Sequence, residues 1–333
     1  MAAREAFRGG APDIPPPVHN EKELDESRIL QYFGARVNCL TATDPAPSLP
    51  NMTEPTVISP GEGRTILLVV AHADDPALFL GGTLIRWADA GWRVVCVRVT
   101  DDRWDSFGPD EAETIAANAA EFRESAARLG LAEIVELGWA TDVLGDASEV
   151  ALREAVIRQI RRCRPYALVS FDPYAMWGED NQDHIKLAAA VDEAFWTSQF
   201  PLHHPEHLAE GLAPHGCFER WYFGRTVTRV TDVVDIADVL DRKLAAALCH
   251  RTMMGNYVNQ LRLQARTGGW SLPMLDAIAA GGDLDEFMAM LVRGGARQVG
   301  ERHGLGPAEE FRVVRFGGLE GLLERFGRRL EAG

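Results

Sequence analysis

The pattern of hydrophobic and polar positions changes at about residue 65. Beyond this point short apolar runs of strand length alternate with longer stretches whose apolar positions recur at helical spacing. The runs at 66–71, 93–99, 133–137 and 166–171 predict strands, and the stretches at 111–129, 148–163 and 183–196 predict helices. This alternation indicates the α/β class, with a Rossmann-like, mostly parallel sheet that carries helices on both faces.

The periodicity weakens after about residue 200. Strands at 220–225 and 311–316 and helices at 236–250, 254–265, 284–293 and 319–328 are still expected. We therefore expect one domain at 61–333, with a core at about 65–200 and a C-terminal helical and strand extension at about 200–333. Residues 1–60 are rich in Pro and Gly and predict an N-terminal arm with one short helix at 21–33.

The most informative chemistry follows the first predicted strand. The apolar run at 66–71 breaks into His72-Ala73-Asp74-Asp75-Pro76, and a helical pattern comes next. Proline suits the first turn of a helix, where its missing N–H is not needed. The break lies at the carboxyl end of the strand, where open α/β sheets bind their ligands. His72 and Asp75 are therefore candidate metal ligands.

A second polar segment leaves the predicted strand at 166–171. By the topology above, it emerges at the same edge of the sheet as His72. It ends in Asp183-His184 at the start of a helix, with Asp183 expected as the helix cap. Two histidines and one carboxylate with open positions would suit a catalytic Zn²⁺ or Fe²⁺ ion. Spacing alone leaves open that His184 is a cap or a half-buried core histidine.

Several motifs together resemble a known family. AHADD at 71–75 resembles the AHPDD signature of the PIG-L/LmbE family of metal-dependent N-deacetylases. The members of this family are similar to N-acetylglucosaminyl deacetylases. NQDH at 181–184 resembles the second motif of that family. Arg123-Glu124, Asp142 and the stretch at 235–246 with His250 are similar to further family features. The resemblance spans about 65–315.

The resemblance implies both an activity and a site. It implies a zinc-dependent hydrolase, with iron as the other metal, that removes an N-acetyl or N-acyl group from a small amino-sugar conjugate. His72, Asp75 and His184 would be the metal ligands and Asp74 the general base for a metal-activated water. Since aspartate also caps helices well, capping of the following helix is the competing interpretation of Asp74 and Asp75.

Two positions depart from the family pattern. Pro76 stands where the family commonly has Glu, so an orienting hydrogen bond from that Glu is absent. Asn181 stands where the family often has His. Asn181 can donate a neutral hydrogen bond but cannot transfer a proton. We therefore expect Asp74 to act as both base and acid, with Asn181 as an additional catalytic residue.

Candidate substrate-binding residues come from three places. Arg123 offers a guanidinium fork for hydroxyls, a phosphate or a carboxylate, and Asp142 resembles an acceptor for sugar hydroxyls. Asp102 and Trp104 lie in the loop at 101–108, which follows the second strand, and Trp104 could stack on a sugar face. The alternatives are a surface ion pair for Arg123, a turn cap for Asp142 and core packing for Trp104.

Composition narrows the partners. The formal net charge of -15 argues against nucleic acid or an anionic membrane. Five scattered cysteines without a CxxC motif, and no apolar run of membrane-spanning length, predict a cytoplasmic protein without membrane insertion. A small N-acetylated sugar conjugate is the expected partner, and a homo-oligomer is allowed.

Two other functions stay open, and a third is disfavoured. The first is an amide hydrolase for a non-sugar N-acyl substrate, and the second is a metal-free binding homologue. The third, a nucleotide-binding Rossmann protein, is disfavoured because no GxGxxG follows the first strand. The histidines at 203, 204, 207 and 215 lack a second motif, so a second metal site there is not favoured.

Overall fold

The computed structural model describes residues 54–175 and 178–330 of the 333-residue chain. The helix predicted at 21–33 and most of the predicted N-terminal arm lie outside the described residues. Residues 54–60 of the arm are described, and the chain from 54 to 64 contains no regular helix or strand before the first strand. Trp92 lies beside this segment and donates a hydrogen bond from Nε1 to the carbonyl oxygen of Ser59 at 2.8 Å.

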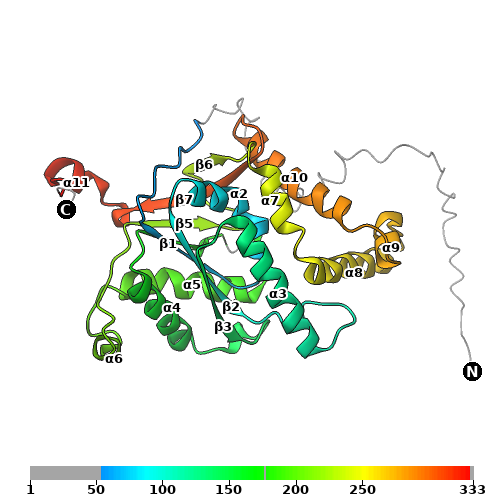
Figure 1. Cartoon of the computed structure of the whole chain (residues 1–333), viewed down its shortest axis with the longest axis horizontal. Coiled ribbons are helices and arrows are strands. Elements are labelled where there is room, and N and C mark those ends of the chain that lie inside the picture. The colour runs from blue at the N-terminus through cyan, green and yellow to red at the C-terminus, as the bar shows by residue number, and fades with distance from the viewer. Residues whose placement is uncertain (1–53, 176–177, 331–333) are drawn as a thin grey trace, which may run out of the picture.

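The described strands form one seven-stranded sheet in the order β3-β2-β1-β4-β5-β7-β6 (Figure 1). The parallel part consists of β3 (Glu133–Trp139), β2 (Arg93–Thr100), β1 (Thr65–Val70), β4 (Ala167–Phe171) and β5 (Glu219–Phe223). The remaining strands, β7 (Ala308–Arg315) and β6 (Asp232–Asp235), continue the sheet in antiparallel pairing. The predicted fold class, a mostly parallel α/β sheet, is confirmed.

Helices cover both faces of the sheet (Figure 1). One face carries α4 (Glu149–Cys163) and α5 (Gln182–Thr197), and the other carries α2 (Asp75–Asp89), α3 (Glu111–Leu129) and α7 (Leu240–Ala247). Because β1 and β4 lie between these layers, their apolar side chains are buried on both sides. This explains why both strands read as continuous apolar runs.

Local capping chemistry fixes where the helices begin. Asp110 and Glu113 form a capping box at the start of α3, and Ser148 caps α4. The prediction for α5 was wrong by two residues. Asn181 is the cap, and its Oδ1 accepts the N–H groups of Asp183 at 2.8 Å and His184 at 3.4 Å. The carboxylate of Asp183 is therefore free for contacts elsewhere.

The chain beyond residue 200 supplies both strands and helices. β5, β6 and β7 complete the same sheet as β1–β4. A helical group of α8 (Arg251–Thr267), α9 (Pro273–Ala279) and α10 (Asp285–Arg302) extends from the side that carries α3 and α7 (Figure 1). Two short helices, α6 (Pro205–Ala209) and α11 (Glu320–Phe326), lie at the periphery. The sequence analysis did not predict β6, α6 or α9.

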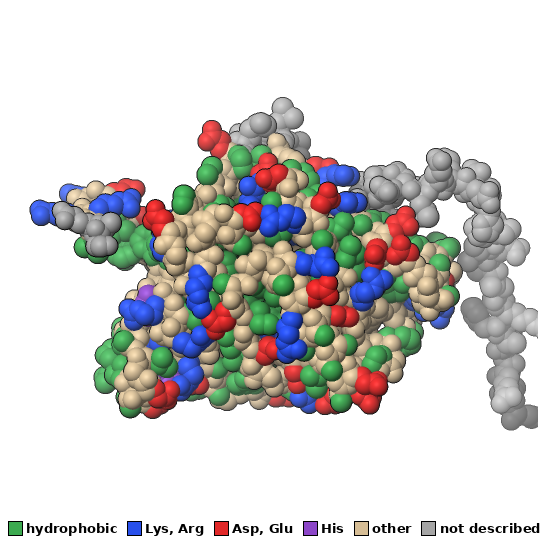
Figure 2. Space-filling model, in the orientation of Figure 1, with side chains coloured by type: hydrophobic (Ala, Val, Ile, Leu, Met, Phe, Trp, Pro, Cys, Tyr) green, Lys and Arg blue, Asp and Glu red, His purple; other side chains and the backbone are tan. Residues whose placement is uncertain are grey.

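The surface shows no large area of one charge on the face drawn in Figure 2. Lys and Arg side chains are interspersed with Asp and Glu side chains there. This face therefore lacks the continuous basic surface that nucleic acid binding needs. Among the helices that the structure describes, none has both the length and the apolar character needed to cross a membrane.

Candidate metal centre

Three predicted ligands meet at the carboxyl edge of the sheet. His72 lies between β1 and α2, Asp75 begins α2, and His184 lies in the first turn of α5. His72 Nδ1 is 3.0 Å from His184 Nε2. The Asp75 carboxylate approaches both imidazoles, with Oδ1 3.3 Å from His184 Nε2 and Oδ2 3.7 Å from His72 Nδ1. All three side chains are almost fully buried.

The spacing of these donor atoms fits a tetrahedral cation. Two ligands bound about 2.1 Å from one ion at tetrahedral angles lie roughly 3.4 Å apart. The observed separations of 3.0, 3.3 and 3.7 Å, in which Asp75 faces His184 with Oδ1 and His72 with Oδ2, lie on both sides of this value. Two imidazoles and a carboxylate are also a donor set that borderline divalent metals prefer. The described residues can therefore hold one divalent cation with open positions for water and substrate.

The turn that carries His72 and Asp75 is fixed by hydrogen bonds. The backbone N–H of His72 donates to Asp75 Oδ2 at 2.7 Å. The backbone N–H of Ala73 donates to Asp102 Oδ2 at 3.1 Å, and Thr100 Oγ1 donates to the carbonyl oxygen of Ala71 at 2.7 Å. These bonds hold the ligand-bearing backbone against the end of β2 before any metal arrives.

Asp102 has a different place from the one predicted for it. Its side chain is fully buried and accepts hydrogen bonds from Ala73, Arg98 and Thr100. Burial raises the pKa of Asp102 to about 7, although His72 and Arg98 oppose the rise. Since the carboxylate is directed into the protein and not toward a substrate, its role is to support the ligand turn.

Both histidines have an outer carboxylate at the nitrogen that faces away from the cluster. His72 Nε2 lies 3.5 Å from Asp183 Oδ2, and His184 Nδ1 lies 2.9 Å from Glu179 Oε2. Asp183 is held in turn by the backbone N–H groups of Asp142 at 2.7 Å and Leu144 at 3.1 Å. Carboxylates in such positions fix the tautomer and the ring orientation of metal-binding histidines.

The acidic surroundings favour positive charge at this point. Burial alone would lower the pKa of His72, but Asp183, Asp75 and neighbouring carboxylates raise it to about 10. Burial opposes ionisation of His184 in the same way, and Asp75 and Glu179 raise its pKa to about 9. These carboxylates stabilise positive charge, which protons on the two histidines carry when no metal is bound. A divalent cation would supply that charge instead.

Asp74 occupies the N-cap position of α2 without capping it. Its side chain makes no capping hydrogen bond, although the residue is only 2% exposed. Burial and the charge of Asp75 raise the pKa of Asp74 well above its ordinary value. Capping was the competing interpretation of this residue, and the described hydrogen bonds do not support it. The carboxylate is therefore free for chemistry beside the three ligands.

The other predicted site residues differ in their placement. Asn181 has its side-chain oxygen engaged in capping α5, and Asp142 is an exposed residue whose backbone N–H binds Asp183. Trp104 is 49% exposed, so it is not a core residue. Arg123 is 57% exposed and pairs with Glu136 at 2.8 Å. This ion pair is the alternative expected for Arg123.

Three further residues near the cluster were not singled out by the sequence analysis. Asp105 has a ligand-forming oxygen within 4.8 Å of those of His72 and Asp102, and a buried carboxylate oxygen without a partner among the described residues. The charge of Asp74 is the largest cause that raises the pKa of Tyr257 on α8. Glu179 is the third residue. The acidic loop after β2 was the only sequence signal for Asp105.

The second histidine group does not offer a comparable site. His204, Glu206 and His207 have donor atoms within reach of one another. However, the two ring nitrogens of His207 face Arg161 at 3.2 Å and Glu154 at 2.7 Å. A guanidinium beside the imidazole disfavours a cation there, so these side chains serve the packing of α6.

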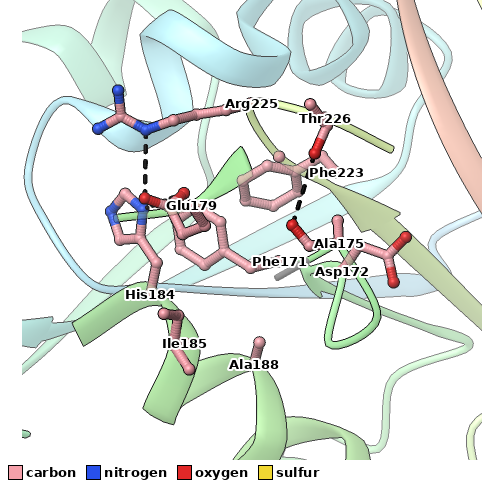
Figure 3. Close-up of a pocket in the computed structure, with 11 residues that line it drawn as sticks. Phe171, Asp172, Ala175, Glu179, His184, Ile185, Ala188, Phe223, Arg225 and Thr226 are labelled. Atoms are coloured by element: carbon pink, nitrogen blue, oxygen red, sulfur yellow. Dashed lines mark hydrogen bonds and ion pairs between the residues drawn. The ribbon is translucent and has the colours of Figure 1, made fainter. Parts of the chain in front are cut away.

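A small cleft adjoins the metal centre on the side of His184 (Figure 3). It is lined by residues of β4, β5, α5 and the loops that follow the two strands, among them Phe171, Glu179, Phe223 and Arg225. The His184 ring stacks on Phe171 with a centroid distance of 4.1 Å. His72, Asp74 and Asp75 do not line this cleft, so it lies beside the cluster and not over it.

The fold and the site together define an α/β protein with a His-Asp-His group, able to hold a divalent cation, at the carboxyl edge of a parallel sheet. Residues 67–195 match the family model described as PIG-L: GlcNAc-PI de-N-acetylase. The matched segment contains all three candidate ligands and Asp74.

Individual relatives are similar to this chain over part of its length. The diacetylchitobiose deacetylase of Thermococcus kodakarensis is 29% identical over 203 residues, which cover 60% of this chain and 73% of the relative. The 1D-myo-inositol 2-acetamido-2-deoxy-alpha-D-glucopyranoside deacetylase of Mycobacteroides abscessus is 30% identical over 159 residues, 40% of this chain and 57% of the relative. The solved N,N'-diacetylchitobiose deacetylase of Pyrococcus horikoshii shares the fold, with a TM-score of 0.61 at 20% identity over 92% of this chain and 97% of that one.

Proposed function

We propose that this chain is a zinc-dependent hydrolase that removes an N-acetyl group from an amino sugar in a small conjugate. The observation that carries the proposal is the convergence of His72, Asp75 and His184 around one point, with the uncapped carboxylate of Asp74 beside them. The relatives named above support the substrate class, because both act on N-acetylated sugars by their printed names.

The chemistry follows from the residues at hand. When bound, a divalent cation polarises an amide carbonyl and lowers the pKa of a water molecule. Asp74 is the proton acceptor for the attacking water in this proposal, and it returns that proton to the leaving amine. Asn181 contributes at most a neutral hydrogen bond from its amide nitrogen, because its oxygen caps α5.

The residues around the cluster would bind the sugar. We assign the exposed Trp104 to an apolar face of the sugar and Asp142 to its hydroxyl groups. Asp105 joins them, because its carboxylate has an oxygen within 4.8 Å of the donor atoms of His72 and Asp102 and can accept a hydroxyl hydrogen bond.

The test is the metal content together with acetate release. Purified protein should hold about one zinc per chain, and it should release acetate from N-acetylglucosamine conjugates faster than from N-acyl amino acids. The His184→Ala variant should lose both the metal and the activity, since a ligand is removed. The matched control is His204→Ala, which replaces a histidine outside the metal cluster whose Nδ1 lies 3.0 Å from Oε1 of the exposed Glu206.

Each outcome separates the alternatives. Activity confined to N-acyl amino acids would favour the non-sugar amide hydrolase. Full metal content and full activity in His184→Ala would reject the proposed ligand set. A wild-type protein without stoichiometric metal and without acetate release would leave a binding homologue.

A further inference from the structure

Glu179 lies between His184 of the metal cluster and Arg225 in the loop after β5. Its Oε2 lies 2.9 Å from His184 Nδ1, and its Oε1 accepts the Nε–H of Arg225 at 3.2 Å and the backbone N–H of Asn181 at 3.0 Å. Figure 3 shows the carboxylate between the Arg225 guanidinium and the His184 ring. Both carboxylate oxygens are therefore fixed by partners from separate segments.

This contact determines which nitrogen of His184 can bind a metal. A carboxylate only accepts hydrogen bonds, so His184 Nδ1 must carry the proton that it donates to Glu179. The lone pair then lies on Nε2, which faces His72 Nδ1 at 3.0 Å and Asp75 Oδ1 at 3.3 Å. Stacking on Phe171, with 17° between the ring planes, fixes the remaining rotation of the imidazole.

Arg225 supplies the charge that keeps Glu179 in place. It lies just after β5, outside the segment 67–195 that matches the family model. Its Nε–H donates to Glu179 Oε1 at 3.2 Å, so a positively charged side chain faces this carboxylate. Arg225 is 46% exposed and Glu179 only 11%, so the arginine forms the outer side of the pair.

The pair also bears on the proline at position 76. Pro76 carries no side-chain donor or acceptor, so it cannot orient a ligand through a side-chain hydrogen bond. In this chain a carboxylate from the opposite loop, Glu179, contacts the metal-binding imidazole instead.

We propose that Glu179, held by Arg225, is a positioning residue that sets the tautomer and orientation of His184 and thereby the metal affinity of the site. This inference rests on the metal site of the proposed function. Residues that orient metal-binding histidines typically change metal affinity 10- to 100-fold, roughly, when they are replaced. The effect belongs to Glu179 as a hydrogen-bond acceptor with a full negative charge.

The experiment measures metal binding with Zn²⁺ alone, by competition with a chelator, in the full chain. Glu179→Ala should raise the Zn²⁺ dissociation constant about 10- to 100-fold. Glu179→Gln keeps the hydrogen-bond acceptor but not the negative charge, so its Zn²⁺ affinity should fall about tenfold. Arg225→Ala changes an exposed side chain, so its Zn²⁺ affinity should fall less than that of either Glu179 variant. The absorption spectrum of the Co²⁺-loaded protein should shift in both Glu179 variants, because the ligand geometry changes.

The chain offers a control of the same form. His303 Nε2 lies 2.8 Å from Glu310 Oε2, and Arg302 donates to Glu310 Oε1 at 2.6 Å. Glu310→Gln breaks the charge balance of that triad without touching the ligand cluster, so it should leave Zn²⁺ affinity and the Co²⁺ spectrum unchanged. Thermal unfolding of the metal-free proteins checks that the variants are folded.

The outcomes separate this inference from the proposed function. Zn²⁺ affinity within twofold of wild type in Glu179→Ala overturns the positioning role and leaves the hydrolase proposal intact. If the Glu179 variants do not fold, affinity in Arg225→Ala equal to wild type, with an unchanged Co²⁺ spectrum, overturns it in the same way. A wild-type protein that binds Zn²⁺ but releases no acetate overturns the hydrolase proposal, and the affinities still decide the role of Glu179.

Discussion

Asp74 is the residue at which structure and chemistry are most closely linked. Aspartate at an N-cap position normally spends its carboxylate on the N–H groups of the helix. Here Pro76 removes one of those donors, and the carboxylate makes no capping bond. A buried carboxylate without a structural hydrogen bond costs stability unless it has another use. Its position beside the three ligands supplies that use in the proposed hydrolase.

Replacement of Asp74 by Asn separates metal binding from proton transfer. Asp74→Asn keeps the size of the side chain but removes the base, so we expect the zinc content to stay and kcat for acetate release to fall about 100-fold or more. Asp241→Asn changes an 89% exposed carboxylate on α7 and should match wild type in both measurements. A kcat within threefold of wild type in Asp74→Asn would exclude its role as base.

The residues of the centre were predictable to different degrees. His72 and Asp75 follow a strand end and His184 begins a helix, and parallel topology brings such positions to one edge. Spacing alone left His184 open as a cap or a core histidine, and the full ligand set came from the family resemblance. Glu179 was not predictable, because its orientation depends on Arg225, which lies 46 positions further along the chain. Arg123 was expected at the substrate, but Glu136 on the neighbouring strand β3 binds its guanidinium. Such a partner becomes visible only when the strand order is known.

The α2 helix shows how a distant strand can shape the element that carries the ligands. Leu80 has non-helical angles, with φ -137° and ψ 21°, so the helix is kinked there. Beyond the kink, the N–H groups of Gly82 and Thr83 donate to Glu309 of β7 at 2.9 and 2.7 Å. Gly82 also has to lack a side chain, because a Cβ would lie 2.5 Å from Ile236. The Gly81-Gly82 pair inside a predicted helix thus has a packing reason.

Glu309 also forms a buried ion pair with Lys243 of α7, at 2.7 Å. Both side chains are at most 4% exposed, so Glu309→Gln would leave an uncompensated ammonium group in the core. We expect a loss of about 3 kcal/mol in the free energy of unfolding, as measured by urea denaturation. The double variant with Lys243→Met should recover part of this loss. If the double variant is as unstable as the sum of the two single variants, the unpaired charge is not the cause.

Element prediction succeeded where the pattern was long. The helix at 111–129 was predicted with the observed bounds, because a capping box opens it and Gly130, at φ 78°, closes it. β6 was missed because it contains only Val233 and Val234 between two aspartates. A strand this short is stabilised by its pairing with β7, and no periodicity of its own announces it.

At the scale of the whole molecule, the sheet joins the family-matched segment to the chain beyond residue 200. Asp172 at the end of β4 binds Arg312 of β7 at 2.6 Å, across β5. It also accepts hydrogen bonds from the backbone N–H and the hydroxyl of Thr228. The carboxylate of Asp172 is completely buried. One ionised group therefore holds together strands that are 140 positions apart in sequence.

This arrangement predicts a specific acid dependence of stability. Burial would raise the pKa of Asp172, but Arg312, the N–H of Tyr174 and Thr228 lower it below the ordinary value. A group whose pKa is lower in the folded state stabilises the protein fully above its unfolded pKa of about 3.9, and this contribution is lost as the pH falls through the folded pKa. Asp172→Asn should therefore be less stable than wild type at pH 7, by about 2 kcal/mol in urea unfolding. The gap should narrow as the pH falls from about 5 toward 3.

Asp180→Asn, a change at a 76% exposed carboxylate, should show no such pH-dependent gap. A difference between Asp172→Asn and wild type that is equally large at both ends of this range would mean that the ion pair is not what joins the two parts of the sheet.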